Sequence, residues 1–237
     1  MDLLLEIVRC PNVQACLADP EKKHPCRKIV QSQGEKAAEH FQVPEPWSGH
    51  LETAPILFLS SNPSISQDEE YPRFGWGDEL IGDFFDNRFG GGRKPWITEG
   101  RYYLRKNGEP SENWVRYWAS VRKRAAELLD PKEVRPGVDY ALSEVVHCKS
   151  ESEIGVDAAQ DECAERYLRP IVEASGAAVV VCLGDKAAKT VRRMFKVPER
   201  KRIYRISGVG QRDRYFAFLP HPNARSKRKS FQAILSQ

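Results

Sequence analysis

The chain has 237 residues, of which 41% are hydrophobic and 30% are charged, a composition typical of a globular domain with a sizeable core. No apolar stretch approaches the roughly 18–20 residues that span a bilayer, and the opening residues lack the basic start and long apolar run of a signal peptide. We therefore expect a cytoplasmic protein with no membrane partner, folded as a single domain over 1–237.

Positive charge is concentrated in the last part of the chain. Residues 186–237 contain 15 Lys and Arg against only Glu199 and Asp213, so the net charge of +4 conceals an acidic first part. A basic region of this kind favours a polyanionic partner, because binding to phosphates releases counterions. A solvated basic tail is the alternative, although these residues flank apolar runs that resemble strands.

The hydrophobic pattern predicts helices and strands that alternate along the chain. In the first half of the chain we expect a helix at 3–8 and a loop within the cysteine-bearing N-terminal segment 1–50, a mostly helical and then irregular stretch at 31–54, a strand at 56–59, an irregular insertion with a hairpin signal at 67–111, and a helix at 114–129 with Trp114 and Trp118 on its apolar side. In the second half we expect strands at 140–147, at 177–183 and within 209–219, and helices at 157–175, 185–195 and 231–235. Asp185 is the expected N-cap of the helix at 185–195. This alternation predicts a parallel sheet covered on both faces.

Two polar clusters directly follow buried strands. The first is Ser60-Ser61-Asn62-Pro63-Ser64, and the second is His221-Pro222-Asn223-Ala224-Arg225-Ser226. Ligands bind outside the carboxyl ends of the strands in open α/β sheets, so we expect Asn62 and His221 to face one crevice although about 160 residues separate them. Taken alone, each cluster is equally well explained by a turn or a surface histidine.

Over roughly residues 50–230 the chain resembles the uracil-DNA glycosylase superfamily. Ser60-Ser61-Asn62-Pro63 is similar to its Gly-x-Asp/Asn-Pro motif, and His221-Pro222-Asn223 is similar to its His-Pro-Ser motif. Residues 140–149 resemble the Thr-Asn-Val-Val-Lys-Cys-Arg strand of the iron–sulfur branch, which Leu183-Gly184-x-x-Ala187 also matches. The resemblance implies a three-layer α/β/α fold around a mainly parallel four-stranded sheet. It also implies a monofunctional DNA glycosylase of base excision repair that removes uracil or a related deaminated base.

The resemblance further implies roles for individual residues. His221 would donate to the departing base and so stabilise its negative charge, while Asn62 would align the attacking water through hydrogen bonds. The target base leaves the duplex and stacks on an aromatic side chain. The implied base-binding residues are Ser61, Glu144, Phe74 and Phe84, with core packing as the alternative for the two phenylalanines; the implied DNA-binding residues are Ser64, Asn223, Arg225, Lys227 and Arg228.

Glu144 departs from the family, which has a base-reading Asn at this position. An amide offers a donor and an acceptor, whereas an ionised carboxylate offers acceptors only. Three possibilities stay open. The base differs from uracil, burial protonates Glu144 and restores a donor, or Glu144 pairs with a basic residue away from the base.

The cysteines follow the iron–sulfur branch in part. Cys148 and Cys163 fit its second pair of cluster ligands, but the close Cys-x-x-Cys of the first pair is missing. The implied ligand set is Cys16, Cys26, Cys148 and Cys163, with Cys10 as the alternative member, around a structural [4Fe–4S] cluster that takes no part in the chemistry. The alternatives are that these cysteines bind zinc or that they are free structural thiols.

Two rival functions remain from the sequence. One is a DNA-binding member of the superfamily with lost or altered catalysis, suggested by Asn62 and Glu144. The other is a nucleotide-binding α/β protein with an incidental basic tail. In the favoured hypothesis the partner is DNA that contains a deaminated base, and the protein acts as a monomer in the cytoplasm, on the nucleoid if it is bacterial.

Overall fold

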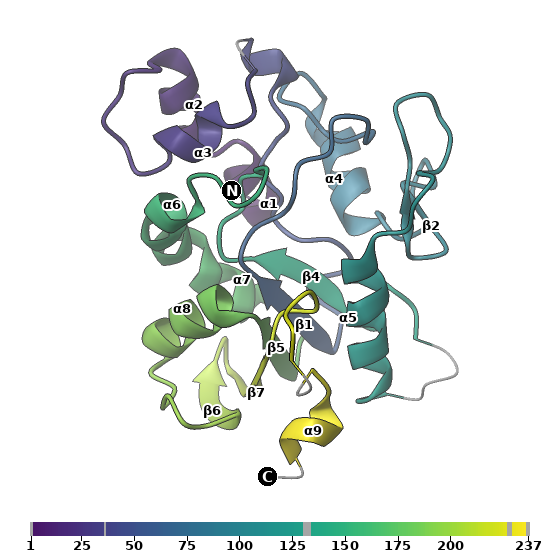
Figure 1. The fold of residues 1–237 in the computed structure, drawn as a ribbon, viewed down its shortest axis with the longest axis vertical. Helices are drawn as coiled ribbons and strands as arrows, with labels where there is room; N and C mark the ends of the chain where they lie inside the picture. Colours follow the sequence, from purple (N-terminus) through teal and green to yellow (C-terminus); the bar gives the residue numbers. More distant parts are fainter. Residues whose placement is uncertain (1, 36, 130–133, 227–228, 236–237) are drawn as a thin grey trace.

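A computed structural model describes residues 2–35, 37–129, 134–226 and 229–235. Its elements, in chain order, are α1 (Leu3–Val8), α2 (Pro11–Ala18), α3 (Arg27–Gln31), η1 (Ala38–His40), β1 (Ile56–Ser60), α4 (Asp78–Asp86), β2 (Ile97–Thr98), β3 (Tyr102–Tyr103), α5 (Arg116–Ala126), β4 (Ala141–Glu144), α6 (Val156–Cys163), the π-helical η2 (Ala164–Leu168), α7 (Arg169–Ala174), β5 (Val179–Leu183), α8 (Asp185–Phe195), β6 (Ile203–Val209), β7 (Arg212–Leu219) and α9 (Phe231–Leu235) (Figure 1). In the described part of the chain, no helix is both long and apolar enough to cross a membrane.

The central sheet has five strands in the order β4-β1-β5-β7-β6. The first four are parallel, as the alternation of elements predicts, but β6 runs antiparallel to β7 at the edge. The expectation of four strands was therefore one strand short. The missed strand β6 buries only Val209 and has a bulge between Ile206 and Val209, so it lacks the continuous apolar run that marks a buried strand.

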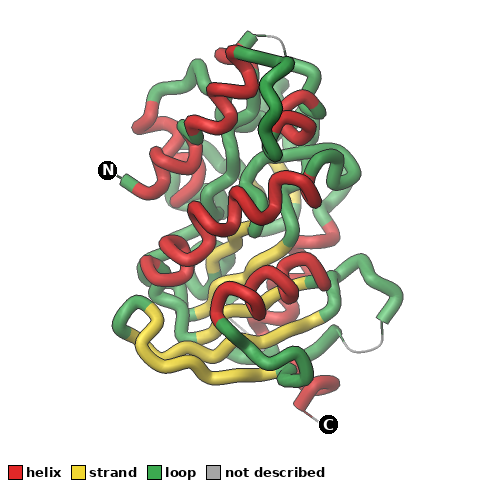
Figure 2. The backbone as a smooth tube through the Cα atoms, turned by 90° about the vertical axis from the view of Figure 1, so that its left-hand side faces the viewer, coloured by secondary structure: helices red, strands yellow, loops and turns green. Residues whose placement is uncertain are grey.

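Helices cover both faces of this sheet. Alternate strand residues point to opposite sides, and two buried clusters result. Leu57, Val180 and Phe216 pack in the cluster that includes residues of α1, α6, α7 and α8. Phe58 and Val181 pack in the other cluster, with residues of α5 and α9. The tube in Figure 2 shows helices in front of the twisted strands, and the fold is an α/β architecture compatible with three layers.

The N-terminal region differs from its prediction. The segment expected as a loop contains α2, because Pro11 occupies its first turn, where a missing N–H costs nothing. In the described part of 31–54 the chain is mostly irregular, as expected for its second half, and the helical part is limited to the end of α3 and the short η1. Ser48 exchanges backbone hydrogen bonds of 2.8 and 3.0 Å with Leu142 at the edge of β4, which satisfies this segment in an extended conformation.

The predicted insertion 67–111 is more regular than expected. It contains α4 and the β2–β3 ribbon, and the turn at 105–108 closes with an antiparallel bridge between Leu104 and Pro110, which confirms the hairpin signal. Two details of the helices were wrong. Trp114 is 48% exposed and precedes α5, and Gly184, not Asp185, is the N-cap of α8, because the chain turns there at φ 92°.

Candidate active site at the carboxyl ends of the strands

The parallel strands β1, β4, β5 and β7 all end at one edge of the sheet, where a cavity of about 200 Å³ lies. Its lining brings together five of the residues expected at the site, namely Asn62, Ser64, Glu144, His221 and Asn223. The expectation that the two polar clusters share one crevice is therefore confirmed.

His221 presents a hydrogen-bond donor to this cavity. Its Nδ1 accepts the backbone N–H of Asn223 at 3.2 Å, so in the neutral ring the proton resides on Nε2. Burial lowers the pKa of His221, which favours the neutral ring. The ring stacks on Tyr117, with centroids 6.0 Å apart and planes inclined by 15°. Gly184 makes this placement feasible, because a Cβ there would lie 3.1 Å from the His221 Cβ.

Asn62 presents an acceptor. Its Nδ2 donates to the Pro63 carbonyl and to the Ser150 hydroxyl, both at 3.0 Å. Because a carbonyl oxygen only accepts, the first bond fixes the amide orientation and leaves Oδ1 as the group that turns to other partners. Within the described residues no hydrogen bond uses Oδ1. Asn62 can therefore accept a hydrogen bond from a water molecule or a substrate.

Glu144 closes the inner end of the cavity. It lies opposite Ser60 in the β1–β4 register and is 5% exposed. Burial raises the pKa of this carboxyl well above its usual value, and the nearby charge of Glu45 adds to the effect. Its Oε2 is buried without a hydrogen-bond partner among the described residues. The hydroxyls of Ser60 and Tyr117 form a hydrogen bond beside it.

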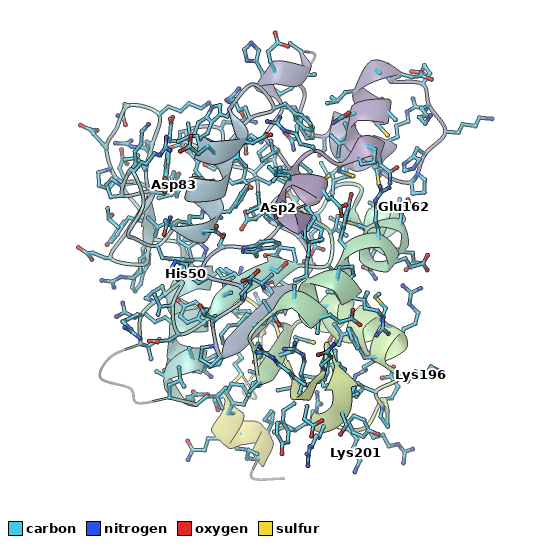
Figure 3. All side chains as sticks on the ribbon, turned by 180° about the vertical axis from the view of Figure 1, so that it is seen from behind. Asp2, His50, Asp83, Glu162, Lys196 and Lys201 are labelled. Atoms are coloured by element: carbon cyan, nitrogen blue, oxygen red, sulfur yellow. The ribbon has the colours of Figure 1, made fainter. Side chains whose placement is uncertain are left out.

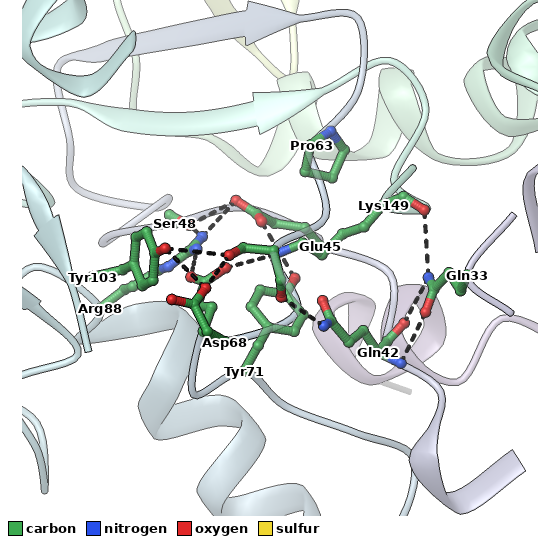
Figure 4. Close-up of polar contacts among 12 residues, drawn as sticks. Gln33, Gln42, Glu45, Ser48, Pro63, Asp68, Tyr71, Arg88, Tyr103 and Lys149 are labelled. Carbon is green, nitrogen blue, oxygen red and sulfur yellow. Dashed lines mark hydrogen bonds and ion pairs between the residues drawn. The ribbon is translucent and has the colours of Figure 1, made fainter. Parts of the chain in front are cut away.

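A network of buried charges forms the floor of the cavity (Figure 4). Arg88 is paired with Glu45 at 2.8 Å and with Glu69 at 2.6 Å, and Lys149 is paired with Glu69 at 2.9 Å. Burial acts to raise the pKa of Glu69, but Lys149 and Arg88 outweigh burial and hold this pKa below its usual value. Two cations thus balance two carboxylates, and each is at most 8% exposed.

Three of the predicted base-binding residues lie outside the lining of this cavity. The Ser61 hydroxyl donates to Glu153 at 2.6 Å. Phe74 packs against Phe41, with ring centroids 5.7 Å apart, and Phe84 is 1% exposed among other aromatic rings. Both phenylalanines thus follow the core-packing alternative.

The aromatic residues that do line the cavity are Tyr103, Tyr117 and Trp118. Sequence reasoning missed the two tyrosines. For Tyr117 a signal was present, since it lies four residues before the buried Val121 on the same helix. Tyr103 gave none, because its strand has only two residues.

The loop after β7 carries the predicted DNA-binding residues. Asn223 and Arg225 are exposed, while Lys227 and Arg228 lie outside the described residues. Lys229 anchors the end of this loop, since its Nζ donates to the Pro222 carbonyl at 2.7 Å and its own carbonyl accepts from Arg124.

Part of the basic excess in 186–237 is structural. Arg214 is fully buried and donates mainly to backbone carbonyls, including that of Ser175 at 2.8 Å, and Arg192 donates to the Lys201 carbonyl at 2.7 Å. In contrast, Lys196 and Lys201 are exposed and extend outward (Figure 3). Only the exposed members of the basic segment are therefore available to a polyanion.

The cysteines gather at a second, smaller cavity. It is lined by Cys10, Cys26, Cys148 and Cys163 with apolar neighbours, so the alternative member Cys10 takes the place expected for Cys16. Burial raises the pKa of Cys26 to about 12, and the neighbouring thiols add to the effect.

The four thiols at this cavity are the residues on which the expected cluster depends. No group of three or more His, Cys, Asp or Glu side chains in the described ranges is arranged around one metal ion. A [4Fe–4S] cluster takes four thiolates at separate irons, and the cavity brings together four cysteines, two of them directly before α2 and α3, one in α6 and one in the loop after β4.

A scan against protein-family models gives no match for this chain, and no curated protein matches its sequence significantly. The interpretation of the site therefore depends on its geometry and on the motifs.

Proposed function

We propose that the chain is a monofunctional DNA glycosylase with the uracil-DNA glycosylase fold, which flips uracil or a related deaminated base out of DNA and hydrolyses its N-glycosidic bond. One observation carries the proposal. His221, whose neutral ring carries its proton on Nε2, and Asn62, whose Oδ1 has no partner among the described residues, line the same cavity from the ends of β7 and β1.

The two groups suit the two halves of the reaction. As the N-glycosidic bond breaks, negative charge develops on the base and positive charge on the sugar. The Nε2–H of His221 donates to a carbonyl oxygen of the base and stabilises the anion in a partly buried site, where a hydrogen bond is stronger than in water. Asn62 Oδ1 accepts from a water molecule and holds it for attack on the sugar. An amide aligns water without removing its proton, so we expect slower hydrolysis than with a carboxylate.

The cavity provides a place for the flipped base. Tyr117 and Trp118 come from α5, and Tyr103 comes from the β2–β3 ribbon. Such aromatic faces stack on bases of any identity. Ser64 lines this cavity and is exposed, and the exposed Arg225 follows the lining residue Asn223 by two positions. We propose that both contact backbone phosphates, and we expect salt-dependent binding. The protein would act on DNA as a monomer in the cytoplasm.

A [4Fe–4S] cluster on Cys10, Cys26, Cys148 and Cys163 would have a structural role. When bound, such a cluster cross-links chain segments and, as proposed here, supplies no step of base release. In this chain it would tie α2 and α3 to the loop after β4 and to α6. Zinc is the alternative ligand of these thiols.

A DNA-binding member with altered catalysis is the second candidate, and it is favoured by the amide at Asn62 and the carboxyl at Glu144. The test is a panel of oligonucleotides with a single uracil, hypoxanthine or xanthine, incubated with the wild type and with His221→Ala and then cleaved by alkali. We expect cleavage of at least one substrate by the wild type and a large loss in the variant. No cleavage of any substrate would refute the enzyme proposal, and equal cleavage by both proteins would remove His221 from the mechanism.

A further inference from the structure

We propose that Glu144 enters the cavity as an uncharged carboxylic acid and reads a base edge on which a ring N–H lies beside a carbonyl oxygen. The inference rests on the proposed function and deepens it. It assigns to this carboxyl the selection of bases such as uracil, hypoxanthine and xanthine.

The side chain of Glu144 lies at the same cavity as the two proposed catalytic residues. Glu144 ends β4 beside Ser60 of β1 and lines the same cavity as Asn62 and His221. Its side chain is almost fully buried, and Oε2 has no partner among the described residues. A buried polar atom without a partner is costly, and more so when the group is charged, so the unpartnered Oε2 favours the uncharged carboxyl.

The charged side chains around Glu144 are paired with one another. The cations nearest the cavity floor are already used, since Arg88 pairs with Glu45 and Glu69, and Lys149 pairs with Glu69. In the described part of the chain Glu144 has no ion pair, and Ser60 and the nearby charge of Arg88 offset the cost of burying an ionised carboxylate only in part.

The other titratable groups around the cavity do not change this balance. Tyr117 faces Glu144 from α5, and its pKa is raised well above its usual value, mainly by burial, so its hydroxyl stays neutral. His221 faces the cavity as a neutral ring. At the rim, Glu153 is held by Ser61 and Lys186, and its charge works against ionisation of Glu144.

The chemistry of the two protonation states differs at the base. A carboxylic acid offers an O–H donor and a C=O acceptor, which complement a carbonyl and an adjacent ring N–H. A carboxylate offers acceptors only, so it repels the carbonyl oxygen of the same edge. The neutral acid therefore supplies the same pattern as the amide that the family resemblance leads one to expect at this position.

The test compares wild type, Glu144→Gln and Glu144→Ala from pH 6 to pH 10, with uracil excision as the readout. The Gln side chain keeps a donor and an acceptor at every pH. We expect Glu144→Gln to approach wild-type kcat/KM at neutral pH and to lose the wild type's decline at alkaline pH, whereas Glu144→Ala loses at least about tenfold. Glu153→Gln serves as the matched control: it removes a carboxylate whose charge opposes ionisation of Glu144, so the alkaline decline should persist and shift toward lower pH.

Two results would overturn the inference. One is equal loss in Glu144→Gln and Glu144→Ala. The other is the same alkaline decline in wild type and Glu144→Gln. A second readout does not depend on activity: ¹³C NMR of labelled glutamate carboxyls, with the Glu144 signal assigned by its absence in Glu144→Gln. An ionised Glu144 at pH 7 would refute the inference even if no base is released, while a neutral Glu144 in an inactive protein would refute only the proposed function.

Discussion

Replacing Arg88 with Met should cause a large loss of stability, because it removes the central cation beneath the candidate site. Arg88 is 3% exposed and is the only ion-pair partner of Glu45 among the described residues, while Glu69 keeps Lys149. Breaking a buried ion pair from one side leaves an uncompensated charge and costs about 3–5 kcal/mol. In a chain of this length, that cost corresponds to a fall in Tm of roughly 6–20 °C.

Thermal unfolding of the purified variant measures this effect directly. Arg93→Met is the matched control, because Arg93 pairs with Glu79 on the surface, where the side chains are 53% and 85% exposed and a pair contributes at most about 1 kcal/mol. The loss caused by Glu45→Gln should also be smaller in the Arg88→Met background than in wild type, since the carboxylate is then unpaired. A fall in Tm for Arg88→Met no larger than that of the control would refute the buried network.

Three further predictions concern the fold, the charge state and the DNA contact. Gly155→Ala should lower the free energy of unfolding measured in urea by more than the about 1–3 kcal/mol expected from backbone strain alone. The reason is that Gly155 has a φ of 79° and that a Cβ there would lie 2.4 Å from a backbone nitrogen of α3. Gly34→Ala is the control, because Gly34 has a φ of 70° but open space around it, so its loss measures the strain alone. The free energy of unfolding of wild type relative to Glu144→Gln should be constant below about pH 4.5 and should fall as the pH rises toward the raised pKa of the folded protein. The cause is that the unfolded carboxyl releases its proton at a lower pH than the folded one. A constant difference across that range would contradict an uncharged Glu144 in the folded protein. Arg225→Ala should weaken DNA binding and lower the salt slope by about 1, whereas Arg193→Ala, which removes an arginine already paired with Asp161, should not; equal slopes for the two variants would count against the contact.

The central part of the fold could be predicted because its strands are continuous apolar runs. The runs that became β1 and β5 are buried on both faces, and α8 and α9 have the predicted bounds. Because parallel strands end at a common edge, the meeting of Asn62 and His221 followed from their positions in the sequence.

Other parts were not predictable from local pattern. The edge strand β6 has a single buried residue, Val209, so no continuous apolar run marks it in the sequence. The choice between Cys10 and Cys16 depends on how α2 is oriented, which sequence spacing does not specify. The aromatic lining came from Tyr103 and Tyr117 instead of Phe74 and Phe84, because helix α4 turns Phe84 into the core.

The resemblance and the geometry agree on one pair of side chains, and base release by that pair is the central claim. The most direct measurement is mass-spectrometric detection of free base after the purified chain is incubated with DNA that contains uracil, hypoxanthine or xanthine, with an Asn62→Ala/His221→Ala double variant alongside. We predict that the wild type releases one of these bases and that the double variant releases it far more slowly. Absence of free base from every substrate, with DNA binding intact, would contradict the account.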